Sequence, residues 1–215
     1  LAGVGAVVLS VLAGWSETLH GDASWTLWLL PLFSILGIFV YQKLSIPLST
    51  GTLSVVDAQR VGKPVPVKLA LAIPLGTALT LLGGGSVGKE AAALQMGGAI
   101  ASGTASWISR RETGDKRGIY RTVILCGMAA AFSAFMFAPV AAALFVLELT
   151  RMKPSHLRDA RLLCVPLSSA VAYAIARVCG VGNLWVVAVD VPSFSSCLLE
   201  VIVLGALCAF AGVAF

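Results

Sequence analysis

Long apolar runs follow one another along nearly the whole chain and are separated by short polar segments. The runs lie at approximately residues 3–16, 25–42, 67–82, 91–108, 119–150, 162–179 and 194–215. Several of them reach the roughly 17–25 residues that a helix needs to cross the hydrocarbon core of a bilayer. The pattern therefore predicts an all-α, polytopic membrane protein.

Composition supports this prediction. The 215 residues are 58% hydrophobic and only 12% charged, and their mean hydropathy is +0.94. A soluble domain of this size cannot bury so much apolar surface, so we expect an integral membrane protein in contact with lipid. The first apolar run lacks the basic residues that begin a cleavable signal peptide. Both ends of the chain lie in apolar sequence, which favours a part of a longer protein.

Three polar or proline-containing segments interrupt the apolar pattern, at 45–52, at 83–90 and at Phe137-Ala138-Pro139. Non-helical backbone at membrane depth is tolerated only where protein buries it or where it borders a polar cavity. Proline can begin a new helix, so Pro139 predicts two short helices within 119–150 instead of one long span. We therefore expect broken and re-entrant helices.

Basic residues gather in two linkers and account for most of the net charge of +5. One linker holds Arg110, Arg111, Lys116, Arg117 and Arg121, and the other holds Arg151, Lys153, Arg158 and Arg161. Short basic loops mark the cytoplasmic side of a membrane, and we prefer this interpretation to nucleic-acid binding. The linker 180–193 contains Asp190 but no Lys or Arg, which suits the opposite face.

Histidine and cysteine offer no obvious chemistry. The five cysteines lack the spacing of a metal site. His20 and His156 are isolated near the ends of segments, as interfacial histidines are. We therefore expect neither a metal site nor a cofactor.

The segment "GGGSVGKE" (83–90) almost spells a nucleotide-binding P-loop. Gly83, Gly88 and Lys89 fit the pattern G-x-x-x-x-G-K, but Glu90 stands where the loop needs Ser or Thr. A helix that begins after a glycine-rich turn directs its free N–H groups and positive dipole end toward the break. Such an end attracts anions. Within an apolar chain, the segment predicts a cradle for a small anion rather than for ATP.

Glu90 itself is an anion tethered to the first turn of this predicted helix. When ionised, it can occupy the free N–H groups; when protonated, it loses that attraction and can move away. A glutamate that merely favours the helix dipole is the commoner case. An ionisable residue among apolar spans is nevertheless a functional hypothesis by default, so we interpret Glu90 as a gate.

These residues resemble the CLC family of chloride channels and chloride/proton antiporters. Gly88-Lys89-Glu90 matches the start of the family motif G-[KR]-E-G-P, and residues 28–44 and 126–149 are similar to family helices. The segment from Phe194 onward is similar to the first helix of the family's second half. The resemblance implies that 1–215 is a single transmembrane domain, the N-terminal half of an inverted-repeat architecture. It also implies a homodimer, and we expect the plasma (inner) membrane of a bacterium.

The resemblance assigns roles to seven residues. Glu90 matches the gating glutamate, and Thr50 best matches the serine whose hydroxyl binds the central anion, with Ser49 as the alternative if the register shifts. The implied anion-binding residues are Ser49, Thr50, Gly51, Gly88, Lys89 and Ala91.

The chain also departs from the family pattern. Ala91 and Ala92 replace the glycine and proline of the motif, and Leu149 aligns with the internal proton-carrying glutamate, although Glu148 remains beside it. Leucine cannot carry a proton, so ordinary chloride/proton exchange is in question. Chloride or another halide is the expected ligand, and a fluoride/proton antiporter of the same family is the alternative.

Two further functions compete with anion transport. Glu90 could act as a base in a membrane-embedded enzyme, but it lacks a partner such as His in the sequence around it. The Gly- and Ala-rich segments could be packing surfaces of a helical scaffold, but a scaffold does not need an ionisable residue at a break. We expect a transporter or channel and no enzyme.

Overall fold

A computed structural model describes residues 1–22, 24–111, 114–150, 163–179 and 194–214 as helices and connecting loops. The helices are α1 (Ala2–Asp22), the 3₁₀-helix η1 (Ser24–Leu29), α2 (Leu30–Lys43), α3 (Thr52–Val61), α4 (Leu69–Leu82), α5 (Lys89–Arg111), α6 (Lys116–Met136), α7 (Pro139–Leu149), α8 (Cys164–Val178) and α9 (Phe194–Ala214). The described residues contain no strand, which confirms the all-α prediction.

The chain forms two compact units, Leu1–Asn183 and Leu184–Phe215. The described part of the second unit is α9, an apolar helix. The first unit contains the other helices and all of the predicted site residues. The expectation of one transmembrane domain over 1–215 stays a prediction.

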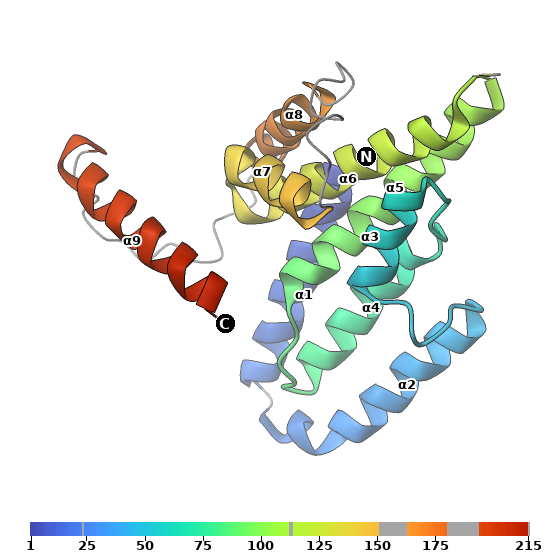
Figure 1. Ribbon diagram of the computed structural model, residues 1–215. Coiled ribbons are helices and arrows are strands. Elements are labelled where there is room, and N and C mark those ends of the chain that lie inside the picture. Colours follow the sequence, from blue (N-terminus) through green and yellow to red (C-terminus); the bar gives the residue numbers. More distant parts are fainter. Residues whose placement is uncertain (23, 112–113, 151–162, 180–193, 215) are drawn as a thin grey trace. The chain divides into compact units, whose positions relative to one another are not determined.

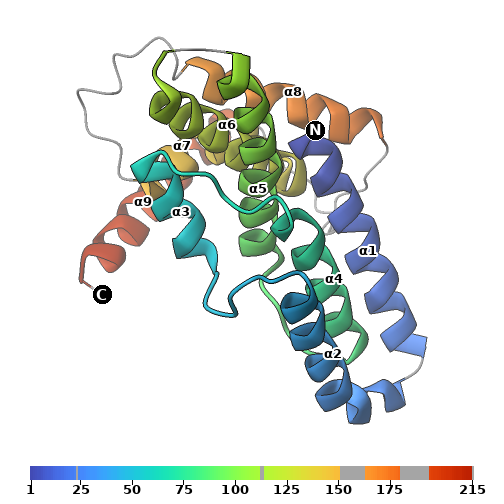
Figure 2. The same ribbon diagram turned by 90° about the vertical axis from the view of Figure 1, so that its right-hand side faces the viewer.

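The centre of the first unit is α5, which packs against α1, α3, α4 and α6 (Figures 1 and 2). Small residues allow α5 and α6 to approach closely: a Cβ atom added to Gly97 would lie 2.4 Å from the carbonyl oxygen of Gly127. Such contacts between glycines are typical of helix packing in membranes. The Gly- and Ala-rich sequence of α5 therefore forms the buried middle of the unit.

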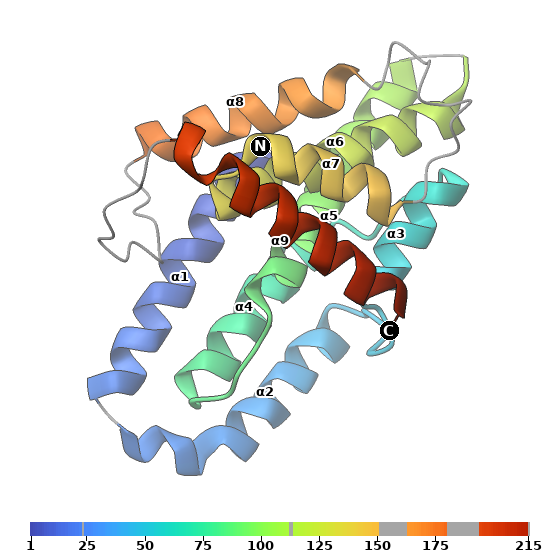
Figure 3. The same cartoon turned by 60° about the vertical axis from the view of Figure 1, so that its left-hand side comes forward.

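Within the described part of the chain, three helical segments are long and apolar enough to cross a membrane: Ala2–Gly21, Trp25–Lys43 and Lys116–Met136. The segment that contains α2 has large apolar side chains on its surface, among them Trp28 and Ile35, and none of the described residues of α2 is buried. Figure 3 shows α2 beside α4 at one end of the first unit. A surface of this kind suits lipid.

The predicted breaks are confirmed at all three places. Loops at 44–51 and 83–88 separate helices, and α6 ends before Phe137, whose φ of 57° is left-handed. Pro139 is the first residue of α7, as expected. The prediction of two short helices was wrong for the first of them. Because Asp115 caps α6 by accepting from the N–H of Gly118, at 2.9 Å, the helix starts early and runs for 21 residues.

The first basic linker joins the end of α5 to the start of α6, and its five basic residues are exposed. The guanidinium of Arg111 lies 4.1 Å from the centre of the Trp107 ring. The second basic linker, His156 and the linker 180–193 lie outside the described residues. The predicted sidedness of the linkers therefore stays a prediction.

Candidate functional site

The start of α5 follows a tight glycine-rich loop. Gly84 adopts a left-handed φ of 72°, and Gly85 N–H donates to the Thr80 carbonyl at 2.9 Å, so the loop turns sharply after α4. The N–H of Ala92 donates to the Gly88 carbonyl at 3.4 Å. The N–H groups of the three residues before Ala92 have no acceptor within the helix. They give this end the partial positive charge that attracts an anion.

A cavity of about 300 Å³ opens beside this helix start. Two of the predicted anion-binding residues, Gly88 and Ala91, line it. Its other polar lining groups are neutral and come from α2, α4 and α5: Tyr41, Thr77, Thr80 and Gln95. The Thr80 hydroxyl already donates to the Gly76 carbonyl, at 2.9 Å. The hydroxyls of Tyr41 and Thr77 and the Gln95 amide are therefore the side-chain donors. The described residues that line the cavity include no charged side chain, so it offers hydrogen bonds to an anion without a cation that would trap it.

Glu90 is exposed and makes no hydrogen bond or ion pair with the described residues. Its carboxylate lies close to the loop, since a Cβ atom added to Gly88 would lie 3.7 Å from Glu90 Oε2. Glu90 is not among the residues that line the cavity. The carboxylate is therefore near the helix start but not held by another side chain.

The side chain of Lys89 has a partner that the sequence did not reveal. Lys89 Nζ donates to Glu17 Oε1 of α1, and the Lys89 side chain is only 14% exposed. Adjacent residues on a helix do not face each other, so Lys89 turns to α1 while Glu90 remains free. The resemblance implied that Lys89 binds the anion, but the charge of its side chain is compensated by Glu17.

The predicted central site lies in the loop before α3. Thr50 is half-buried and Ser49 is exposed, and neither hydroxyl makes a hydrogen bond with the described residues. Gly51 is the N-cap of α3, and its N–H donates to Ser54 Oγ at 3.4 Å. None of Ser49, Thr50 and Gly51 lines the cavity at α5.

One side-chain contact joins the starts of α3 and α5. Gln95 Nε2 donates to Thr52 Oγ1 at 2.8 Å, which links the second turn of α5 to the first residue of α3. Gln95 also lines the cavity. Sequence reasoning missed its role, although an amide on a helix of small and apolar residues was an available signal.

His20 is not isolated, contrary to the expectation from sequence. Its Nδ1 lies 2.6 Å from Thr26 Oγ1, within hydrogen-bond distance. Its ring packs on the glycine-rich loop, since a Cβ atom on Gly84 would lie 2.5 Å from His20 Cε1. The sequence could not predict this contact, because the C-terminal end of α1 and the loop are far apart in the chain and meet only in the folded protein.

Comparison with known proteins decides the family. The family described as "Voltage gated chloride channel" matches residues 44–215. The chain belongs to the voltage-gated chloride channel family. This confirms the resemblance to CLC proteins and, with the apolar helices, an integral membrane protein.

The chain is also similar to a protein named "Chloride/fluoride channel protein" from Pseudomonas syringae pv. tomato (strain ATCC BAA-871 / DC3000). It is 31% identical to the chain over 168 residues, which are 78% of this chain and 35% of the relative. The chain thus spans about a third of the length of that relative.

Arg60 caps the end of α7 at Leu149, the residue that the resemblance aligns with the internal glutamate of the family. Leu149 ends α7, and its carbonyl accepts from Arg60 Nη2 at 2.9 Å, while the Thr150 carbonyl accepts from Arg60 Nε at 3.0 Å. A cation at a helix C-terminus is favourable. The neighbouring Glu148 is exposed. The structure thus places a capped helix end, without an acid, at this position.

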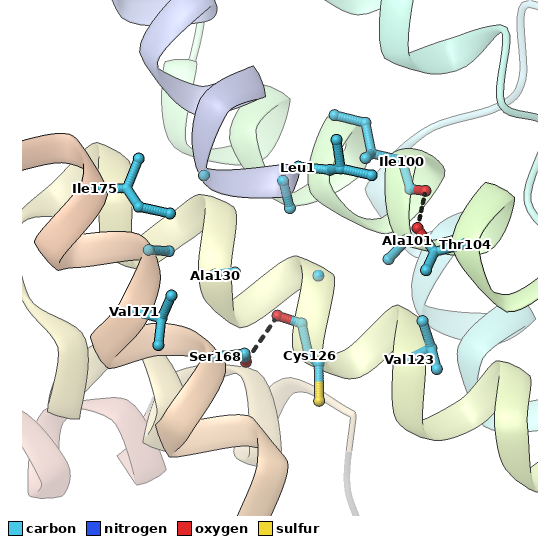
Figure 4. Close-up of a pocket in the computed structure, with 14 residues that line it drawn as sticks. Leu1, Ile100, Ala101, Thr104, Val123, Cys126, Ala130, Ser168, Val171 and Ile175 are labelled. Atoms are coloured by element: carbon cyan, nitrogen blue, oxygen red, sulfur yellow. Dashed lines mark hydrogen bonds between the residues drawn. The ribbon is translucent and has the colours of Figure 1, made fainter. Parts of the chain in front are cut away.

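A second cavity, of about 330 Å³, lies among α1, α5, α6 and α8 (Figure 4). Its lining is mostly apolar, and Ser168 Oγ donates across the interface of α6 and α8 to the Cys126 carbonyl at 3.1 Å. It contains none of the predicted site residues. Of these two cavities, the one at the start of α5 is the one that predicted site residues line, namely Gly88 and Ala91.

Proposed function

We propose that the chain is part of a CLC-type pathway that carries small anions across a membrane, with chloride as the main anion. Glu90 is the proposed gate of this pathway. The observation that carries this proposal is the start of α5, where backbone N–H groups lie beside a cavity with a neutral lining. An anion bound there by amide and hydroxyl donors is attracted but can leave again. Membership in the voltage-gated chloride channel family supports the same function.

Each predicted site residue has a place in this proposal. Glu90 competes with the anion when ionised, because its carboxylate can occupy the N–H groups of the helix start. The anion-binding residues are Ser49, Thr50, Gly51, Gly88, Lys89 and Ala91. Lys89 contributes through its backbone N–H, since its side chain pairs with Glu17. Thr50 contributes its hydroxyl, which has no other partner in the described part of the chain.

Fluoride/proton exchange is the second candidate function. Leu149 is compatible with it, because leucine cannot replace the proton-carrying glutamate of chloride antiporters, and the resemblance implies that the fluoride/proton antiporter branch also lacks this acid. The name of the Pseudomonas relative mentions both chloride and fluoride. Efflux of each halide from liposomes that contain the full-length protein separates the two: faster fluoride efflux supports the exporter, and faster chloride efflux supports the chloride pathway.

The gate is tested by Glu90→Gln in the full-length protein. The amide is nearly isosteric with the carboxylate but neutral at every pH, so it cannot compete with the anion. We expect anion flux from liposomes to remain or to increase and to lose its dependence on pH. In the parent protein, flux rises as pH falls, because protonation of Glu90 removes the competing charge.

Glu148→Gln is the matched control, because Glu148 is also an exposed glutamate but lies at the far end of α7. We expect this variant to keep the pH response of the parent. A Glu90→Gln variant that retains the full pH response contradicts the role of Glu90 as the gate.

The setting of the pathway is also a proposal. We place the protein in the plasma (inner) membrane of a bacterium, since the curated relative is bacterial. Lipid and a second copy of the chain in a homodimer are the proposed partners, and chloride or another halide is the transported ligand. We propose no cofactor, nucleic-acid partner or enzymatic reaction.

A further inference from the structure

The C-terminal end of α1 contacts both ends of the loop that precedes the proposed gate. Glu17 binds Lys89, the first residue of α5, and the His20 ring packs on Gly84 near the beginning of the loop. Figure 3 shows this end of α1 beside the end of α4, where the loop starts. Residues three apart on a helix lie on the same face. One face of α1 therefore holds the loop at two points.

The pair between Glu17 and Lys89 differs from an ordinary surface ion pair. The Lys89 side chain is 14% exposed and that of Glu17 is 44% exposed. A charge that is largely withdrawn from water is costly unless it is paired. The Lys89 ammonium thus depends on Glu17, and among the described residues it forms no other ion pair.

The location of this pair gives it a consequence for the anion. Lys89 is the neighbour of Glu90 and begins the helix whose N–H groups line the proposed pathway. An unpaired ammonium at this place would attract both the anion and the Glu90 carboxylate. Pairing with Glu17 cancels this charge and leaves recognition to neutral donors.

We propose that Glu17 is a positioning residue for the anion site: by pairing with Lys89, it holds the start of α5 against α1 and cancels the charge beside the gate. This inference rests on the proposed function of Glu90 and the α5 start. It adds to that function a residue 72 positions away from Lys89 in the chain.

The contact is tested first without any transport. Glu17→Gln, Lys89→Met and the double variant are made in the full-length protein, and their melting temperatures in detergent are compared with the parent. We expect each single change to lower the melting temperature by roughly 1–4 °C. The melting temperature of the double variant is expected to fall by less than the sum of the two single decreases, because the second change removes a charge that has already lost its partner. Additive shifts overturn the proposal.

The effect on the anion is tested by flux from liposomes at constant ionic strength. Both single changes are made in the Glu90→Gln background, so that the unpaired charge acts on chloride and not on the Glu90 carboxylate. There, Glu17→Gln leaves a net positive charge at the site, so the chloride concentration for half-maximal flux falls by roughly threefold to tenfold. Lys89→Met leaves a net negative charge and shifts this concentration upward. A merely structural role of the pair predicts the same direction for both variants. The proposal is overturned if the half-maximal chloride concentration shifts in the same direction in both variants, or if it does not shift in Glu17→Gln.

Asp57→Asn is the matched control, because it makes the same change in net charge. Asp57 is an exposed acid on α3 that pairs with Arg60 at 3.5 Å and does not contact Lys89. We expect its half-maximal concentration to stay within roughly twofold of the parent, because solvent and salt screen an exposed surface charge. A parent protein that carries no anions contradicts the proposed function, while the melting temperatures still decide whether Glu17 and Lys89 are coupled.

Discussion

Three consecutive residues at the start of α5 have three different roles. Gly88 lines the cavity with backbone, Lys89 ties the helix to α1, and Glu90 extends without a described partner. This division is possible because successive side chains on a helix point in different directions. A single turn can therefore be anchored firmly and still carry a movable carboxylate. Thr50, in the loop before α3, adds a free hydroxyl to the candidate residues.

We predict that the hydroxyl of Thr50 contributes to anion binding. Thr50→Ser keeps the hydroxyl and is expected to bind chloride as the parent does. Thr50→Val keeps the shape but removes the donor, and a hydrogen bond to a charged partner is worth about 1.5–3 kcal/mol. The affinity should then fall by roughly tenfold or more. Titration of chloride into the full-length protein by calorimetry measures this difference.

Thr150→Val is a useful comparison, since the buried Thr150 hydroxyl already donates its proton to the Val146 carbonyl, at 2.9 Å. That change should affect stability more than chloride affinity. Equal chloride affinity in Thr50→Val and the parent would remove Thr50 from the site and leave Ser49 as the remaining hydroxyl.

At the scale of helices, the sequence predicted the breaks better than the lengths or the contacts. The glycine-rich loop at 83–88 and Pro139 act through local backbone preferences, which a sequence reports directly. The length of α6 was underestimated because an apolar run does not mark where its helix begins. Gln95 and Thr52 meet across 43 residues of chain, and such contacts depend on how α3 and α5 pack.

We predict that the crossing of α5 and α6 is sensitive to volume at Gly127. A Cβ atom there would lie 2.2 Å from Ala101 Cβ and 2.5 Å from the Gly97 carbonyl oxygen. Gly127→Val therefore forces the helices apart, and overpacking of this kind costs about 1–3 kcal/mol or more. Thermal unfolding of the full-length protein in detergent should show a lower melting temperature.

Gly14→Ala provides the control, because a Cβ atom at Gly14 meets nothing within 4 Å. Alanine also favours a helix over glycine by roughly 1 kcal/mol, so this variant should be as stable as the parent or more stable. If Gly127→Val melts at the temperature of Gly14→Ala, the close approach of α5 and α6 is not essential to the fold.

At the scale of the whole molecule, the sequence predicted class and family because both rest on patterns that extend over the chain. The apolar runs indicated membrane helices, and the family match over 44–215 confirmed the resemblance. The predicted site stays a prediction. Gly88 and Ala91 line one cavity, and Glu17 and His20 reach the loop from α1, contacts that the sequence could not indicate because no local pattern links residues so far apart. The transported anion was left open because amide and hydroxyl donors suit chloride and fluoride alike.

The orientation of the chain in the membrane gives the last prediction. The exposed basic residues at the junction of α5 and α6 predict that this linker faces the cytoplasm, and the basic sequence of the second linker predicts the same side for it. In a cysteine-free background of the full-length protein, Arg111→Cys and Arg158→Cys should react with a membrane-impermeant thiol reagent only from the cytoplasmic side. Asp190→Cys, in the linker without basic residues, should react from the opposite side. Because α6 and α7 lie between the two basic linkers, labelling of Arg111→Cys and Arg158→Cys from different sides would mean that this pair crosses the membrane once instead of returning. That result would overturn the predicted topology, in which both basic linkers face the cytoplasm.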